Sequence, residues 1–263
     1  MSEQAAPGIP APERAQRDDG PGLIGYLPVG YPDLAGSIDA AVALVEHGVD
    51  GLELGVPYSD PVMDGPVIQD ATQAALERGF KLHDVFAAIR GIRARGVTAP
   101  IWVMTYWNPV VQYGVDRFAD DLKAAGGQGL ITPDITPDSA ADWIAASERT
   151  GLDRIFLAAP TSTDERLDLI VGASRGWIYA VSTMGVTGAR EDVDAAARTL
   201  VARLQAHGAE RVHVGIGIST AAQIADVRSY ADGAIVGSAI VRAIMQDGAA
   251  GAARIATELS SGA

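Results

Sequence analysis

A glutamate in the middle of an apolar run is the first feature of this sequence that indicates chemistry. Glu53 stands at the centre of residues 51–55, Gly-Leu-Glu-Leu-Gly, a composition typical of a buried strand. Burying a carboxylate is costly unless it is paired or used. If Glu53 points into the interior, burial raises its pKa toward the range of a general acid or base. The structural alternative is a carboxylate that binds neighbouring backbone or a buried cation.

The segment after this run, residues 56–66, contains three prolines and two further acids, Asp60 and Asp64. Prolines restrict the backbone and so hold the shape of the loop. A shaped loop that carries acids after a strand is more typical of an active site than of a simple connection. The alternative is that the acidic and hydroxyl side chains only cap turns, because Asx turns are common before proline.

Three later turns are rich in small residues and favour anion binding. They are residues 185–188, 215–217 and 237–238, and each follows a short apolar run. Glycine lets backbone N–H groups approach an anion closely, and barrel enzymes often bind phosphate at such turns. Ser238 would add a hydroxyl and cap the last helix. The alternative is that these glycines only end strands and form turns, since the chain contains 30 glycines.

The elements that must position these residues alternate regularly along the chain. Eight short apolar runs, each followed by an amphipathic run, predict parallel strands joined by helices. Expected strands are 23–29, 51–55, 101–106, 129–131, 154–158, 177–181, 211–215 and 233–236. Expected helices are 37–47 (capped by Ser37), 66–77, 82–95, 115–125, 139–150 (capped by Ser139), 163–173, 192–207, 220–229, 238–245 and 249–259.

Eight such units in about 240 residues predict an α/β fold, a (β/α)8 TIM barrel forming a single domain over residues 23–263. Residues 1–22 are rich in proline, glycine and charge, and we expect a disordered or loosely packed leader. The competing fold is an open doubly wound sheet. It usually has fewer units and a glycine-rich turn after its first strand, and residues 29–32, Val-Gly-Tyr-Pro, are not that fingerprint.

Composition excludes several classes of function. Apolar residues make up 48% of the 263 positions, which is enough to fill a core and excludes a disordered chain. A net charge of −13 argues against nucleic acid or an anionic membrane as partner. The absence of cysteine excludes disulfides and thiolate metal sites, and no His-Glu-x-x-His spacing occurs, so we expect no metal. No apolar run is long enough to span a bilayer and the leader lacks a signal-peptide core, so we expect a cytoplasmic protein.

At this point the motifs are similar to those of a known family. Residues 52–61, Leu-Glu-Leu-Gly-Val-Pro-Tyr-Ser-Asp-Pro, followed by Asp-Gly-Pro at 64–66, resemble the signature of the tryptophan synthase alpha chain family. The resemblance continues almost from end to end. Its other motifs are residues 25–33, 104–109, 131–134, 185–188, 215–219 and 237–240.

The resemblance implies a lyase that cleaves indole-3-glycerol phosphate to indole and glyceraldehyde 3-phosphate by a retro-aldol reaction, the alpha reaction of tryptophan biosynthesis. It implies catalytic roles for Glu53 and Asp64, with Tyr179 near the glutamate and Thr187 orienting the aspartate. The implied phosphate-binding residues are Gly188, Gly217, Gly237 and Ser238.

The resemblance also implies a partner, a beta subunit that receives indole in an alpha2beta2 complex, with Asp60 and Asn108 on the surface that meets it. Pyridoxal phosphate belongs to that partner, and no cofactor is expected on this chain. An apolar slot for indole is expected, with Tyr26, Leu54 and Ile216 as its hypothetical walls.

Two features depart from the family pattern. Residues 12–20, where members usually have a helix across the barrel bottom, have almost no apolar side chains, so this cap is expected to be short or absent. Tyr26 and Ile216 stand where some members have phenylalanine, so the indole slot can differ in shape. Three other functions stay open: a stand-alone indole-glycerol-phosphate lyase, a phosphate-binding isomerase, and a ligand-sensing allosteric subunit without turnover.

Overall fold

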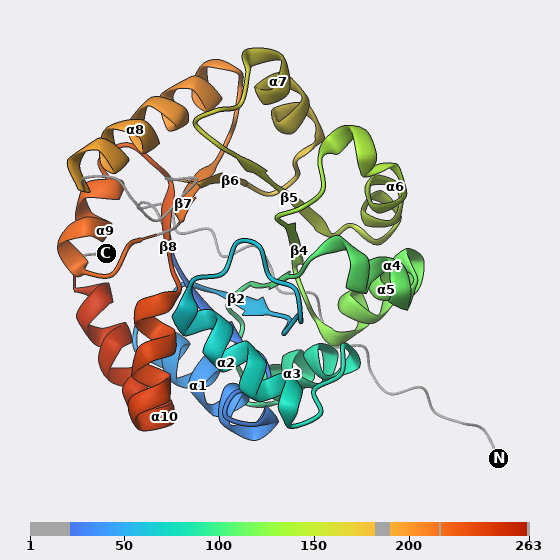
Figure 1. The fold of residues 1–263 in the computed structure, drawn as a ribbon, viewed down its shortest axis with the longest axis vertical. Helices are drawn as coiled ribbons and strands as arrows, with labels where there is room; N and C mark the ends of the chain where they lie inside the picture. The colour runs from blue at the N-terminus through green and yellow to red at the C-terminus, as the bar shows by residue number, and fades with distance from the viewer. Residues whose placement is uncertain (1–21, 182–189, 216, 262–263) are drawn as a thin grey trace.

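Eight parallel strands form one closed barrel, with β8 returning to pair with β1 (Figure 1). The computed structural model describes residues 22–181, 190–215 and 217–261. The strands are β1 (Gly22–Pro28), β2 (Gly51–Gly55), β3 (Ile101–Met104), β4 (Gly129–Thr132), β5 (Asp153–Ala158), β6 (Ile178–Val181), β7 (Val212–Gly215) and β8 (Gly233–Val236). The predicted (β/α)8 barrel is confirmed. Gly22, predicted to end the leader, already pairs in β1.

Helices surround the barrel on its outside (Figure 1). They are α1 (Leu34–Glu46), α2 (Pro66–Glu77), α3 (His83–Ala94), α4 (Trp107–Tyr113), α5 (Val115–Ala125), α6 (Ala141–Thr150), α7 (Asp164–Ala173), α8 (Arg190–Ala206), α9 (Ala221–Val227) and α10 (Ser238–Ser260), with a short 3-10 turn at Pro137–Ser139. Within the described residues, no helix is both long and apolar enough to cross a membrane.

Several helix ends differ from their predicted places. The first helix begins at Leu34, because the Asp33 carboxylate accepts the Gly36 N–H at 2.7 Å and caps it. Ser37, predicted as the cap, lies inside the helix and its hydroxyl donates to the Leu34 carbonyl. Ser139 likewise does not cap α6, since it belongs to the 3-10 turn.

One further difference concerns a whole helix, since the sequence did not predict α4. The two helices predicted at the carboxyl end are confirmed: α10 consists of two helical parts separated where Asp247 and Gly248 leave helical geometry. Gly248 has a φ of +56°, which glycine adopts at little cost.

Alternation along the strands divides the apolar residues into two cores. Leu52 and Leu54 belong to the large cluster that also contains the buried faces of the helices. Because successive strand side chains point to opposite faces, Glu53 between them points into the barrel. The inner cluster consists of Ile24, Trp102, Ile131, Ile155, Trp177, Tyr179, Val181 and Ile235, with Met104 and Leu157 packed against it.

Aromatic rings fill the amino-terminal end of the barrel. The carboxylate of Asp153, the first residue of β5, accepts the indole N–H of Trp102 at 3.1 Å. Trp177 packs edge-on against Trp102 at 5.5 Å and lies 4.7 Å from His213. These contacts fill the barrel interior at the amino-terminal ends of the strands. The predicted departure at residues 12–20 lies outside the described residues.

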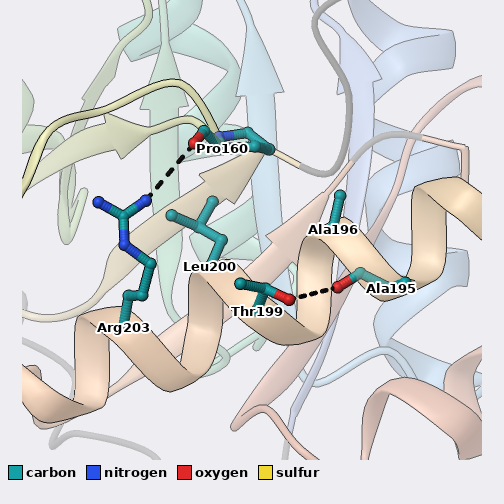
Figure 2. Close-up of a pocket in the computed structure, with 6 residues that line it drawn as sticks. All are labelled: Pro160, Ala195, Ala196, Thr199, Leu200 and Arg203. Atoms are coloured by element: carbon teal, nitrogen blue, oxygen red, sulfur yellow. Dashed lines mark hydrogen bonds between the residues drawn. The ribbon is translucent and has the colours of Figure 1, made fainter.

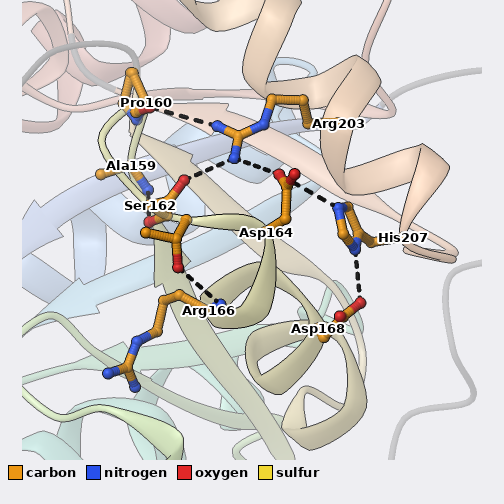
Figure 3. Close-up of polar contacts among 9 residues, drawn as sticks. Ala159, Pro160, Ser162, Asp164, Arg166, Asp168, Arg203 and His207 are labelled. Carbon is orange, nitrogen blue, oxygen red and sulfur yellow. Dashed lines mark hydrogen bonds and ion pairs between the residues drawn. The ribbon is translucent and has the colours of Figure 1, made fainter.

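A polar cluster fastens α8 to α7 and to the loop after β5 (Figure 3). The Arg203 guanidinium donates to the Ser162 carbonyl at 2.7 Å and to the Asp164 carboxylate at 2.7 Å. One turn further, His207 Nδ1 lies 2.6 Å from the Asp168 carboxylate. The cluster therefore joins the two helices that precede and follow β6 in the chain.

Candidate active site

Glu53 is a buried carboxyl group inside the barrel. It is 1% exposed and pairs in register with Tyr26 of β1 and Trp102 of β3. Burial, followed by the nearby charge of Asp64, raises its pKa to about 8. Its Oε2 atom has no hydrogen-bond partner among the described residues. A neutral carboxylic acid with an unused oxygen is suited to deliver a proton to a substrate.

Asp64 lies on the loop between β2 and α2 and faces the same interior as Glu53. Burial raises its pKa to about 6, below that of Glu53. At pH 7 the two carboxyl groups therefore differ, with Glu53 mainly protonated and Asp64 mainly ionised. Asp60, on the same loop, is exposed and accepts a hydrogen bond from the Ser59 hydroxyl at 2.5 Å. Of the two aspartates on this loop, Asp64 faces the interior that contains Glu53, whereas Asp60 faces solvent.

Two buried phenols complete the interior around these carboxyl groups. Tyr26 and Tyr179 are 6% and 7% exposed. Burial raises both pKa values well above the usual one, and the charges of Glu53 and Asp64 raise them further. Because each phenol responds to both carboxyl groups, all four predicted residues meet at one place. Both phenols stay protonated near neutral pH.

The side chains predicted to wall an apolar slot lie in different places. Tyr26 lines the interior, but Leu54 faces the helices and does not reach it. The side chains that the sequence reasoning missed are Met104, Ile131 and Leu157, which pack with Tyr26 or Tyr179 from three different strands. Alternation along those strands is the signal that finds them. Ile216 lies outside the described residues.

Residues of two of the three predicted phosphate turns are described, and they follow β7 and β8. Gly217 follows β7 with a φ of +82°, and space is open around it. Gly237 caps α10, and a Cβ added there would lie 3.5 Å from the Tyr26 ring. Ser238 is the first residue of α10 and does not cap it, contrary to prediction. The amino end of this helix therefore opens next to the phenol. Thr187 and Gly188 lie outside the described residues.

The residues predicted to meet a partner, Asp60 and Asn108, lie on two loops that contact each other. Asn108, near the start of α4, is exposed and its amide donates to the Tyr58 hydroxyl at 3.4 Å. Tyr58 lies on the same loop as Asp60, so two loops from neighbouring strands are joined here. Val62 on this loop is 78% exposed.

A cavity of about 300 Å³ lies elsewhere, between the loop after β5 and α8 (Figure 2). Its lining residues are Pro160, Ala195, Ala196, Thr199, Leu200 and Arg203. None of the predicted site residues lines it, and its Arg203 is engaged with the Pro160 carbonyl. This cavity is therefore separate from the two carboxyl groups. Within the described part of the chain, no three His, Asp or Glu side chains are grouped to hold a metal ion.

The closed barrel, which holds two carboxyl groups of different pKa, places the chain in the class of (β/α)8-barrel proteins. A model of the family described as tryptophan synthase alpha chain matches residues 13–261. The chain is 68% identical over 241 residues to the tryptophan synthase alpha chain of Leifsonia xyli subsp. xyli, with 92% of each chain covered. It is 58% identical over 224 residues to that of Mycobacterium tuberculosis, covering 85% of this chain and 82% of the relative.

Solved structures of tryptophan synthase also match this chain. Tryptophan synthase from Mycobacterium tuberculosis matches with a TM-score of 0.86, 54% identity and 92% of both chains covered. The tryptophan synthase a2b2 complex from Pyrococcus furiosus matches with a TM-score of 0.84 and 35% identity, covering 91% of this chain and 96% of that one. The chain belongs to the tryptophan synthase alpha chain family. It is a lyase of tryptophan biosynthesis, as the sequence predicts.

Proposed function

We propose that Glu53 and Asp64 together cleave indole-3-glycerol phosphate to indole and glyceraldehyde 3-phosphate. The observation that carries this proposal is the opposite protonation of the two groups at pH 7, with pKa values of about 8 and about 6 in one interior. When two carboxyl groups lie in different environments, their pKa values differ, and one site then holds both an acid and an anion.

The reaction has three requirements, and the two carboxyl groups meet them. The carbon–carbon bond breaks after a proton is added to indole C3, and protonated Glu53 is the donor. The glycerol hydroxyl loses its proton as it becomes the aldehyde, and the Glu53 carboxylate left by the first step accepts it. Positive charge develops at the indole N–H, and ionised Asp64 stabilises it by accepting a hydrogen bond from that N–H. Electrons of the broken bond return to the indole ring, so atoms and charge balance.

Substrate binding follows from the walls of the site. Met104, Ile131 and Leu157 supply apolar contacts for the indole ring, between the phenols of Tyr26 and Tyr179. The phosphate binds at the amino end of α10, where backbone N–H groups and the helix dipole favour an anion. Gly217, Gly237 and Ser238 form this end of the site, and we assign Gly188 to the same phosphate and Thr187 to orienting Asp64.

Product transfer involves a beta subunit. We propose that the rim formed by Asp60 and Asn108 docks on it, and that indole passes to the partner in an alpha2beta2 complex. The exposed Val62 lies on the same rim and supports a contact surface there. The chemistry proposed here requires no cofactor on this chain. Because a phosphorylated substrate does not cross membranes freely, we propose that the reaction takes place in the cytoplasm.

Indole release from indole-3-glycerol phosphate by the purified chain, with and without added beta subunit, tests this function. We expect slow release alone and a steep rise with the partner. Fast release that the partner does not change would favour a stand-alone lyase. No indole under either condition would refute the proposed reaction.

A further inference from the structure

We infer that Tyr106 is a positioning residue that holds Asp64 in its catalytic place. The inference rests on the proposed role of Asp64. The Tyr106 hydroxyl oxygen accepts the backbone N–H of Val62 at 2.9 Å and that of Met63 at 3.0 Å. Met63 directly precedes Asp64, so the phenol fixes the backbone one residue before the carboxylate.

These two hydrogen bonds fasten the middle of an otherwise irregular loop. At its start the Val56 N–H donates to the Met104 carbonyl at 2.9 Å. At its end the Gln69 side-chain amide donates to the Asp64 carbonyl at 2.8 Å. The bonds to Tyr106 lie between these points, where the exposed Val62 offers little burial to hold the chain. The position of Asp64 therefore depends on the phenol as well as on the loop ends.

Tyr106 is itself held by the barrel. It is 6% exposed and lies two residues after the end of β3, and its ring centroid lies 5.1 Å from that of Tyr58. The backbone N–H of the next residue, Trp107, donates to both oxygens of the Asp134 carboxylate, at 2.9 and 3.1 Å. Asp134 follows β4. Tyr106 therefore connects the loop that carries Asp64 to the segments that follow two neighbouring strands, β3 and β4.

The charges around the phenol agree with this geometry. Burial raises the pKa of Tyr106, and the charges of Asp64 and Asp134 raise it further, against the effect of the N–H groups of Met63 and Val62. The phenol therefore stays neutral in the working pH range. A neutral hydroxyl has two lone pairs, and the two N–H groups use both.

Tyr106→Phe tests the inference, because it keeps the ring that packs on Tyr58 and removes only the acceptor. We expect kcat for indole release to fall about 10- to 100-fold, since small displacements of a catalytic group have effects of this size. The Kd for inorganic phosphate should stay unchanged. The acidic limb of the pH profile should move to lower pH, because a released Asp64 becomes better solvated and its pKa falls.

The matched control is Tyr113→Phe, which removes a hydroxyl bonded to Asp121 on the outside of the barrel. We expect it to match the unmodified chain in kcat and pH profile. Combining Tyr106→Phe with Asp64→Asn adds a second readout. If Tyr106 acts through Asp64, the double variant is no slower than Asp64→Asn alone.

Outcomes of this experiment separate the inference from the proposed function. If the unmodified chain cleaves the substrate and Asp64→Asn is slow, but Tyr106→Phe keeps its kcat and pH profile, the inference is overturned. Additive losses in the double variant would also overturn it, since they would indicate a merely structural role. If Asp64→Asn cleaves normally, the proposed function of Asp64 fails first.

Discussion

A Cβ added at Gly215 would lie less than 3.0 Å from the hydroxyl oxygen and ring of Tyr179. The two residues stand on neighbouring strands, β7 and β6. The phenol occupies the space that a side chain at position 215 would need, and the charges of Glu53 and Asp64 raise its pKa. Gly55 and Tyr26 have the same relationship on β2 and β1. Each glycine makes room on its strand for a phenol of the site.

Gly215→Ala should therefore displace Tyr179 rather than leave it in place. We expect the chain to fold and indole release to fall at least about tenfold, because the phenol moves within the substrate slot. Steady-state kinetics on the purified variant measures this loss. Gly172→Ala is the control, since it is helical and nothing lies near its added Cβ. Equal activity of the two variants would contradict a role for this close packing.

The pH dependence of kcat/KM should be bell-shaped. Asp64 must be ionised, so activity should rise with pH through about 6. Glu53 must be protonated, so activity should fall as pH rises through about 8. For the free enzyme these limbs report the two groups of the site. Rates measured from pH 5 to 9 would check this, and a profile that keeps rising above pH 9 would remove Glu53 as the proton donor.

Glu53→Gln should lose cleavage while keeping phosphate binding and gaining stability. Cleavage should fall by about 10²- to 10⁴-fold, the usual contribution of one acid–base group. Because the pKa of Glu53 is raised to about 8, the folded state loses stability as pH rises from the ordinary carboxyl pKa through 8. The amide removes this penalty, which is at most about 5 kcal/mol.

Thermal melts at pH 5 and pH 8 test the stability of this variant. The gain in Tm over the unmodified chain should be larger at pH 8, because there the carboxyl of the unfolded chain is fully ionised while burial opposes ionisation of Glu53 in the folded chain. A Tm gain that is the same at both pH values would show that the carboxyl charge does not oppose folding. Near-normal turnover would remove Glu53 from its catalytic role.

Ser238→Ala tests the phosphate end of the site. Ser238 opens α10 without capping it, so its loss should not unfold the helix. One hydrogen bond to a charged group contributes about 1.5 to 3 kcal/mol, so the Kd for inorganic phosphate should rise at least tenfold. Titration calorimetry measures the change. Ser261→Ala, at the opposite end of the same helix, should bind like the unmodified chain, and an unchanged Kd in Ser238→Ala would place the phosphate elsewhere.

Much of this architecture can be predicted from the sequence, because the relevant signals are local. Eight apolar runs separated by amphipathic ones predict the barrel, since each strand must be covered by its own helix. Glu53 stands out because a charged residue is rare in a short apolar run. Local signals fail at helix ends, where Asp33 and Ser37 are both suitable caps and only the backbone conformation decides between them.

The sequence by itself thus determined the fold, the two carboxyl groups and the glycine-rich turns. Only the tertiary structure showed that Leu54 turns away from Glu53, that the slot walls come from three separate strands, and that Tyr106 bonds a loop more than 40 residues away in the chain. The raised pKa values of Glu53 and Asp64 also arise only when the folded chain buries the two groups. The physical reason is common to all of these: each depends on what surrounds a side chain in space, and closing the barrel brings together residues that are distant in the sequence.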